Sequence, residues 1–223
     1  QTKSAVSYKN PVVDIAMPDP TVIKAADGYF YVYATESTRN VPIMKSKDLV
    51  EWTYCNTAFT NKTRPRFEPK AGIWAPDINY INGKYVLYYA MSVWGGEQTC
   101  GIGVATADSP QGPFTDHGKM FRSNEIGVQN SIDPSFLQYE GRNYLVWGSF
   151  RGIYVIELTA DGLSIMPGAK KKRIAGTAFE AVYIHKHGDY YYMFASIGSC
   201  CQGVKSTYKV VVGRSKKVWG PYK

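Results

Sequence analysis

The chain has 223 residues, of which 44% are hydrophobic and 20% are charged, values typical of one globular domain with a large buried core. It contains no run of about 18 apolar residues, so we expect no membrane-spanning helix. The net charge is +8, but the basic residues are scattered apart from the run at 170–173, which we interpret as a solvated loop, and no nucleic-acid-binding motif accompanies them. We therefore expect no nucleic-acid partner.

A turn glycine followed by an aromatic-rich strand occurs four times along the chain. The four glycines are Gly28, Gly83, Gly141 and Gly188, at intervals of 55, 58 and 47 residues. Each glycine joins a short apolar strand to the aromatic one, as in a β-hairpin. A period of this size, without helical periodicity, is typical of a β-propeller with four-stranded blades. We predict an all-β chain, with residues 1–223 forming a single propeller domain.

The strands are expected in groups of three, one group to each repeat. In chain order they cover 21–23, 29–33 and 42–46, then 78–81, 84–88 and 101–106, then 135–137, 142–147 and 152–158, and finally 181–184, 190–194 and 210–215. The first strand of a propeller blade lies nearest the axis, so residues at its start should face the centre of the molecule.

Acidic residues stand at the start of these inner strands. Asp19 lies nine residues before its turn glycine, and Asp133 and Glu180 lie eight residues before theirs. Because a repeat fold brings equivalent positions together, we expect these three carboxylates to share one axial pocket. Asp77 is only six residues from its glycine, and we expect it to make a local hydrogen bond that orders the turn at 74–77. The alternative for each acid is a role in starting a turn, since Asp-Pro pairs favour turns.

Converging carboxylates suit glycoside hydrolysis. The reaction needs a protonated carboxyl to donate to the leaving oxygen and an ionised carboxylate on the other side of the sugar. A third carboxylate can tune the acid through its charge. The chain also contains 18 Tyr, 9 Phe and 5 Trp, which suit strands and also suit the walls of a carbohydrate site.

Several motifs carry a resemblance to a known family. Those around the acids are DPTVI at 19–23, WAPDI at 74–78, IDPSF at 132–136 and FEAVY at 179–183. In this order they resemble glycoside hydrolase family 43. Further motifs are WGSFRGIY at 147–154, SCCQG at 199–203, STY at 206–208 and VGRS at 212–215. These are more similar to the α-1,5-L-arabinanases of the family than to its xylosidases.

The resemblance implies an inverting enzyme with Asp19 as general base, Asp133 as pKa modulator and Glu180 as general acid. It implies an endo-acting enzyme on the arabinan side chains of pectin, working as a monomer in a secreted, periplasmic or cell-surface location. An exo-acting α-L-arabinofuranosidase or β-xylosidase is the alternative within the family. A non-catalytic arabinan-binding propeller is the alternative outside enzymes.

Four further residues are candidates for substrate binding. Trp74 and Trp94 are candidate stacking platforms, although core packing explains Trp74 equally well. Trp94 lies in a loop and is followed directly by two glycines, which favours contact with the substrate. Ser149 and Phe150 lie where the family lines its cleft.

The family fold has five blades, whereas the sequence shows four repeats. We therefore expect this chain to lack the C-terminal fifth blade. In the family that blade carries a His that contacts a central metal ion, often calcium. The resemblance therefore implies a calcium ion at the propeller axis, but we assign no residue of this chain as its ligand.

The four cysteines, Cys55, Cys100, Cys200 and Cys201, fit no zinc-binding spacing. The adjacent pair could form a disulfide, but we expect free thiols.

Overall fold

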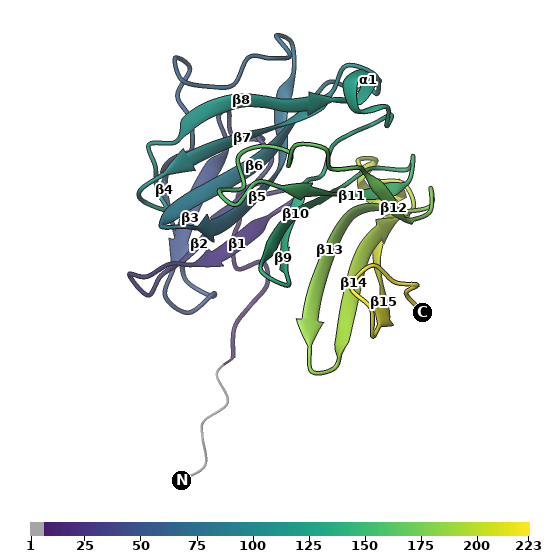
Figure 1. Ribbon diagram of the computed structural model, residues 1–223. Helices are drawn as coiled ribbons and strands as arrows, with labels where there is room; N and C mark the ends of the chain where they lie inside the picture. Colours follow the sequence, from purple (N-terminus) through teal and green to yellow (C-terminus); the bar gives the residue numbers. More distant parts are fainter. Residues whose placement is uncertain (1–6) are drawn as a thin grey trace.

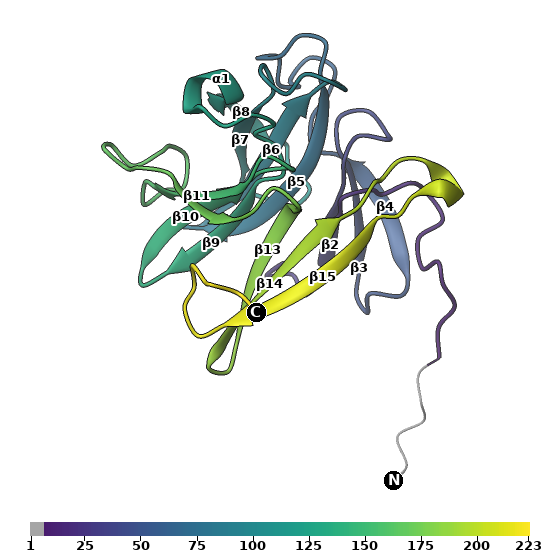
Figure 2. The same cartoon turned by 90° about the vertical axis from the view of Figure 1, so that its right-hand side faces the viewer.

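The computed structural model describes residues 7–223, and in them the chain forms four antiparallel β-sheets arranged as the blades of a propeller (Figure 1). The all-β propeller prediction is confirmed. In each sheet the strands follow one another in chain order, so every blade is a meander that begins at its inner strand. The inner strands lie around the middle of the molecule, as a view along a second direction also shows (Figure 2).

The blades have these bounds. The first contains β1 (Thr21–Lys24), β2 (Phe30–Tyr33), β3 (Pro42–Ser46) and β4 (Trp52–Thr57). The second contains β5 (Gly72–Ile81), β6 (Lys84–Ser92), β7 (Gly101–Ala107) and β8 (Thr115–Arg122), followed by the short helix α1 (Ser123–Ile126). The third contains β9 (Ser135–Tyr139), β10 (Arg142–Trp147), β11 (Ile153–Leu158) and β12 (Lys172–Ala175). The fourth contains β13 (Glu180–His187), β14 (Tyr190–Ile197), the 3₁₀ turn η1 (Gly203–Lys205) and β15 (Lys209–Ser215).

The hydrophobic core is divided into layers between neighbouring blades. Alternate side chains of a strand point to opposite faces of its sheet. In β6, Leu87 and Tyr89 therefore pack against the first blade, while Val86 and Tyr88 pack against the third. A further layer joins the third blade to the fourth. Aromatic residues of the repeated aromatic-rich strands thus fill the spaces between neighbouring blades.

The structure differs from the expected strands in three respects. β5 begins at Gly72, six residues before the expected strand, so residues 74–77 form an irregularity within β5 and not a separate turn. The sequence did not predict the outer strands β4, β8 and β12, which are mostly exposed and lack a long apolar pattern. The basic run at 170–173 is exposed as expected, but its second half forms the start of β12. In residues 7–223, no helix has both the length and the apolar character needed to cross a bilayer.

Candidate active site

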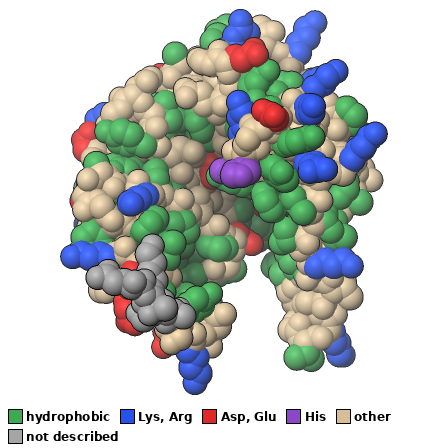
Figure 3. All heavy atoms as spheres, turned by 90° about the horizontal axis from the view of Figure 1, so that it is seen from below, with side chains coloured by type: hydrophobic (Ala, Val, Ile, Leu, Met, Phe, Trp, Pro, Cys, Tyr) green, Lys and Arg blue, Asp and Glu red, His purple; other side chains and the backbone are tan. Residues whose placement is uncertain are grey.

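Three acidic residues lie at the starts of inner strands in three different blades. Asp19 is two residues before β1, Asp133 is two residues before β9, and Glu180 is the first residue of β13. Asp19 is exposed, Asp133 is half-buried and Glu180 is 9% exposed. The molecule is hollowed between its two lobes when seen from below, and acidic side chains lie in the hollow (Figure 3).

Asp133 interacts electrostatically with Glu180 and Asp19. Loss of solvent around Asp133 raises the pKa of its carboxyl well above the usual value, and the negative charges of Glu180 and Asp19 raise it further. A hydrogen bond from the backbone N–H of Ala181 opposes these effects but does not cancel them. The three acids therefore lie at the starts of inner strands, as the repeat spacing predicted, and Asp133 interacts electrostatically with the other two; their catalytic roles stay predictions.

Backbone conformation marks the same positions. Asp19 has φ of 51° and Asp133 has φ of 59°, in the left-handed region that side chains other than glycine rarely adopt. Ala75 in the second blade has φ of 40° and, like the two acids, precedes a proline. Ala75 thus occupies the place that a carboxylate takes in the first and third blades, which explains why Asp77 is displaced from the group. Unfavourable backbone conformations of this kind concentrate at functional sites.

Asp77 links three blades, so the prediction of a purely local hydrogen bond was wrong. It accepts from the hydroxyl of Thr21 in the first blade at 3.4 Å and from the backbone N–H of Phe136 in the third at 2.7 Å. Asn79 provides its one short-range partner, at 2.7 Å. Burial raises the pKa of Asp77 to about 6 despite these bonds.

Asp19 is oriented by Thr35, a residue that the sequence reasoning missed. The Thr35 hydroxyl donates to Asp19 Oδ2 at 2.5 Å and accepts from the backbone N–H of Ala75 at 2.7 Å. Thr35 follows the aromatic strand of the first blade by two residues, and no sequence signal distinguishes it from an ordinary loop threonine.

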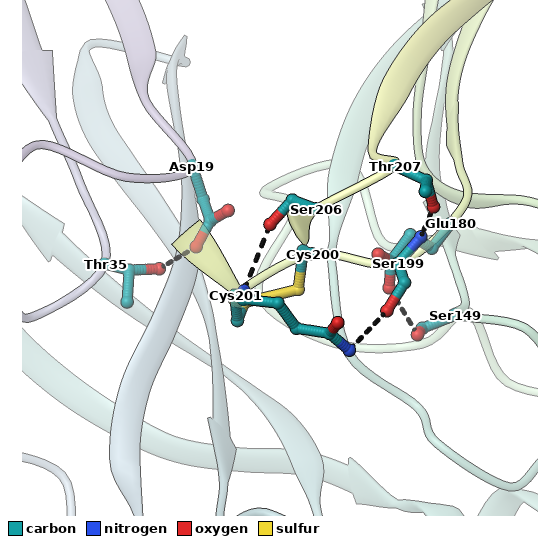
Figure 4. Close-up of a disulfide and its surroundings, with 10 residues drawn as sticks. Asp19, Thr35, Ser149, Glu180, Ser199, Cys200, Cys201, Ser206 and Thr207 are labelled. Atoms are coloured by element: carbon teal, nitrogen blue, oxygen red, sulfur yellow. Dashed lines mark hydrogen bonds between the residues drawn. A yellow bond between two sulfur atoms is a disulfide. The ribbon is translucent and has the colours of Figure 1, made fainter. Parts of the chain in front are cut away.

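Glu180 is held by a chain of hydrogen bonds from the third blade. The Ser149 hydroxyl donates to Glu180 Oε2 at 2.6 Å (Figure 4). The Asn130 side-chain amide donates to Ser149 Oγ at 2.9 Å. Burial and the neighbouring Glu180 both raise the pKa of the Tyr208 hydroxyl. Ser149 is only 2% exposed, so it contacts the acid rather than facing the open cleft. Asn130 and Tyr208 were missed as site residues, although Tyr208 belongs to the STY motif.

The aromatic candidates fall into two environments. Trp94 is 78% exposed, and its ring lies 5.6 Å from that of Trp74, centre to centre. Trp74 is half-buried and packs against a small buried cluster that includes Ile132. Trp94 and Phe150 line a cavity of about 450 Å³ together with residues 198–202. Trp94 and Phe150 therefore line the cavity, whereas the ring of Trp74 packs against that of Trp94.

The expectation of free thiols at the adjacent cysteines was wrong. Cys200 and Cys201 form a disulfide in the loop between β14 and β15. Cys55 and Cys100 are free.

Within the described part of the chain, no three His, Cys, Asp or Glu side chains form a group that could hold a metal ion. The expected calcium at the axis, whose His contact belongs to the fifth blade of the family, stays a prediction, and no catalytic step is assigned to it.

Comparison with known families gives a match over nearly the whole chain. The sequence model of glycosyl hydrolases family 43 matches residues 8–223. Among curated proteins, the extracellular endo-α-(1→5)-L-arabinanase 1 of Bacillus subtilis (strain 168) is 38% identical over 218 residues. The extracellular exo-α-(1→5)-L-arabinofuranosidase ArbA of Cellvibrio japonicus (strain Ueda107) is 35% identical over 233 residues. Each alignment covers 92% of this chain, which spans 66% and 65%, respectively, of the two relatives.

Solved structures agree with the sequence comparison. The α-L-arabinanase of Cellvibrio cellulosa superimposes with a TM-score of 0.83 at 32% identity, covering 94% of this chain and 73% of that one. The family 43 endo-arabinanase of Bacillus licheniformis gives a TM-score of 0.81 at 34% identity, covering 94% of this chain and 75% of that one.

Proposed function

Because the chain belongs to glycosyl hydrolases family 43, we propose that it is an inverting endo-α-1,5-L-arabinanase with Asp19, Asp133 and Glu180 as its acidic machinery. The observation that carries this proposal is the convergence of three carboxylates from three blades, with Asp133 perturbed by the other two. Simple binding of a sugar does not require a separate acid and base, whereas hydrolysis does.

In the proposed reaction Asp19 removes a proton from a water molecule as its oxygen bonds to the anomeric carbon. Glu180 gives its proton to the glycosidic oxygen as the bond from that oxygen to the anomeric carbon breaks. Thr35 fixes one oxygen of Asp19, and Ser149 fixes one oxygen of Glu180. Asp133 acts through its electrostatic interaction with Glu180 and does not itself transfer a proton.

The proposed substrate is arabinan, including the side chains of pectin, and Trp94 and Phe150 provide its apolar contacts. The similar endo-arabinanases named above favour endo action. Exo action is the second candidate, because the Cellvibrio japonicus relative is named as an exo-acting enzyme. We also propose that the protein acts outside the cytoplasm, since both curated relatives are named extracellular, and that it is a monomer, since all three acids come from one chain.

The test is release of reducing sugar from linear debranched arabinan, with the products separated by size. Mixed oligosaccharides at early times indicate endo action, and a single short product indicates exo action. Proton NMR of the first-formed product reports whether the anomeric configuration is inverted. Asp19→Asn and Glu180→Gln should each abolish activity without unfolding the protein; full activity in either variant would refute the assigned roles.

A further inference from the structure

The loop at 198–208 joins β14 to β15 and contains the disulfide between Cys200 and Cys201. Cys201 is exposed and Cys200 is half-buried, so a small reductant in solution can reach the bond. The proposed reaction makes no use of this disulfide. Because the disulfide lies beside the cleft, it can constrain the shape of the loop there.

Hydrogen bonds hold the two ends of the loop together. The backbone N–H of Thr207 donates to the carbonyl of Ser199 at 3.0 Å, and the backbone N–H of Ser199 donates to Thr207 Oγ1 at 3.0 Å. At Gly198 an added Cβ would lie 2.6 Å from the Thr207 carbonyl oxygen, so this close approach requires glycine. The ends are thus fixed independently of the disulfide.

Between these ends, few contacts fix the shape of the loop. The Gln202 side chain donates to Ser199 Oγ at 3.0 Å, and its backbone N–H donates to Ser206 Oγ at 3.0 Å. These bonds are exposed, and exposed hydrogen bonds contribute little net stability because water competes for them. Cys201 has φ of 67°, in the left-handed region. The covalent link between Cys200 and Cys201 is therefore the strongest constraint on this part of the loop.

The same residues form one wall of the cavity of about 450 Å³, and Trp94 and Phe150 complete its lining. In the close-up the disulfide is drawn between Asp19 on one side and Glu180 on the other (Figure 4). Tyr208, the last residue of the loop, lies near Glu180. An apolar disulfide and an exposed indole ring provide surfaces suited to the C–H faces of a sugar.

We propose that the Cys200–Cys201 disulfide holds this wall of the cleft in the shape that binds arabinan, and that its reduction weakens binding without altering the chemical step. This inference rests on the proposed function. With a dithiol as reductant, the disulfide takes up two electrons and two protons and becomes two thiols, while the dithiol becomes a cyclic disulfide. The link between the two side chains is lost, and the wall opposite Trp94 becomes adjustable.

The experiment compares oxidised protein with protein treated with a dithiol, after removal of excess reagent under nitrogen. Titration of thiols should show a gain of two per chain. On debranched arabinan we expect KM to rise about threefold to tenfold, equivalent to about 0.7 to 1.4 kcal/mol, with kcat unchanged within about twofold. Because KM can differ from a dissociation constant, calorimetric titration of Asp19→Asn with a linear arabino-oligosaccharide should show the same change in Kd.

Variants separate the disulfide from other thiols. The double variant Cys200→Ala, Cys201→Ala should behave like the reduced protein and show no response to the dithiol. Cys55→Ala, which removes a free thiol elsewhere, should keep the full response. If reduction unfolds the protein, as judged by circular dichroism, the double variant alone decides: a folded double variant with wild-type KM and Kd overturns the proposal.

Other outcomes also discriminate. Unchanged KM and Kd after a gain of two thiols overturn the role of the disulfide and leave the proposed function intact. A fall in kcat at constant KM also overturns it, because the loop would then act through Glu180. Oxidised protein that neither binds nor cleaves arabinan refutes the proposed function itself, and this inference with it.

Discussion

At Asp133, loss of solvent and two neighbouring carboxylates act in the same direction. All three favour the protonated form and raise the pKa of this side chain. Neighbouring carboxylates cannot all be ionised cheaply, and the raised pKa of Asp133 is the result. This coupling is the means by which a residue that transfers no proton can control one that does.

Replacing Asp133 with Asn tests the coupling. Without the carboxyl of Asp133, whose pKa is raised well above its usual value, the descending limb of the pH–rate profile should move to lower pH. Activity at neutral pH should fall about tenfold to a hundredfold. The melting temperature should hold or rise, because a buried like-charge interaction has been removed. An unmoved limb with full activity would leave Asp133 with only a turn-forming role.

Replacing Ser149 with Ala separates positioning from substrate contact. A hydrogen bond contributes about 0.5–1.5 kcal/mol, so loss of the Ser149 hydroxyl should lower kcat about twofold to tenfold with little change in KM. Ser46→Ala is a matched control, since Ser46 is also 2% exposed but lies in β3 of the first blade. A rise in KM at constant kcat would instead support the direct substrate contact that the sequence predicted.

At the scale of elements, Asp77 joins the inner strands of three blades through its two carboxylate oxygens. Asn would satisfy the same partners. Its carbonyl oxygen could replace Oδ2 as acceptor from Phe136 and Asn79, and its amide could donate to the hydroxyl of Thr21. The connection between blades therefore needs the shape of this side chain and not its charge.

The pKa of Asp77 is raised to about 6 from a usual value of 3.8, so the native state binds a proton more tightly than the unfolded state does. Stability from this group is greatest below pH 4 and is lost as pH rises to about 6, by about 3 kcal/mol at most. Urea denaturation of wild type and Asp77→Asn between pH 4 and 7.5 isolates the effect. The two stabilities should diverge with rising pH in favour of the variant, and parallel curves would contradict the prediction.

The elements show which features a sequence can predict. The hairpins at the four turn glycines were predictable because aromatic and β-branched strands alternate around a local turn. The outer strands β4 and β8 were not, because solvent-exposed edges carry little apolar pattern. Likewise the three acids could be aligned by their offsets, whereas Thr35 and Asn130 act through contacts that only the folded chain creates.

At the scale of the whole molecule, four blades enclose three hydrophobic layers, so the fourth blade has one face without a neighbour. Its sheet is also the only one in residues 7–223 with three strands, and β15 forms its edge. Across this face Tyr183 pairs with Phe194, and Phe194 with Val212. Tyr183 is 52% exposed and Val212 is 58% exposed. Such apolar faces and open strand edges favour association.

We predict that a fifth blade covers this face. Full burial of a large apolar side chain contributes about 1.5–3 kcal/mol, so a chain extended by about 60–100 residues should melt at higher temperature and elute as a monomer. Val212→Lys is the matched probe. In the 223-residue chain it should reduce association with little effect on melting, whereas in the extended chain it should lower the melting temperature by burying a charge. If this chain forms a stable dimer that Val212→Lys dissociates, a second copy covers the face instead. Equal melting temperature, solubility and activity of the two chains would show that the face needs no cover, and the expectation of a fifth blade would be wrong.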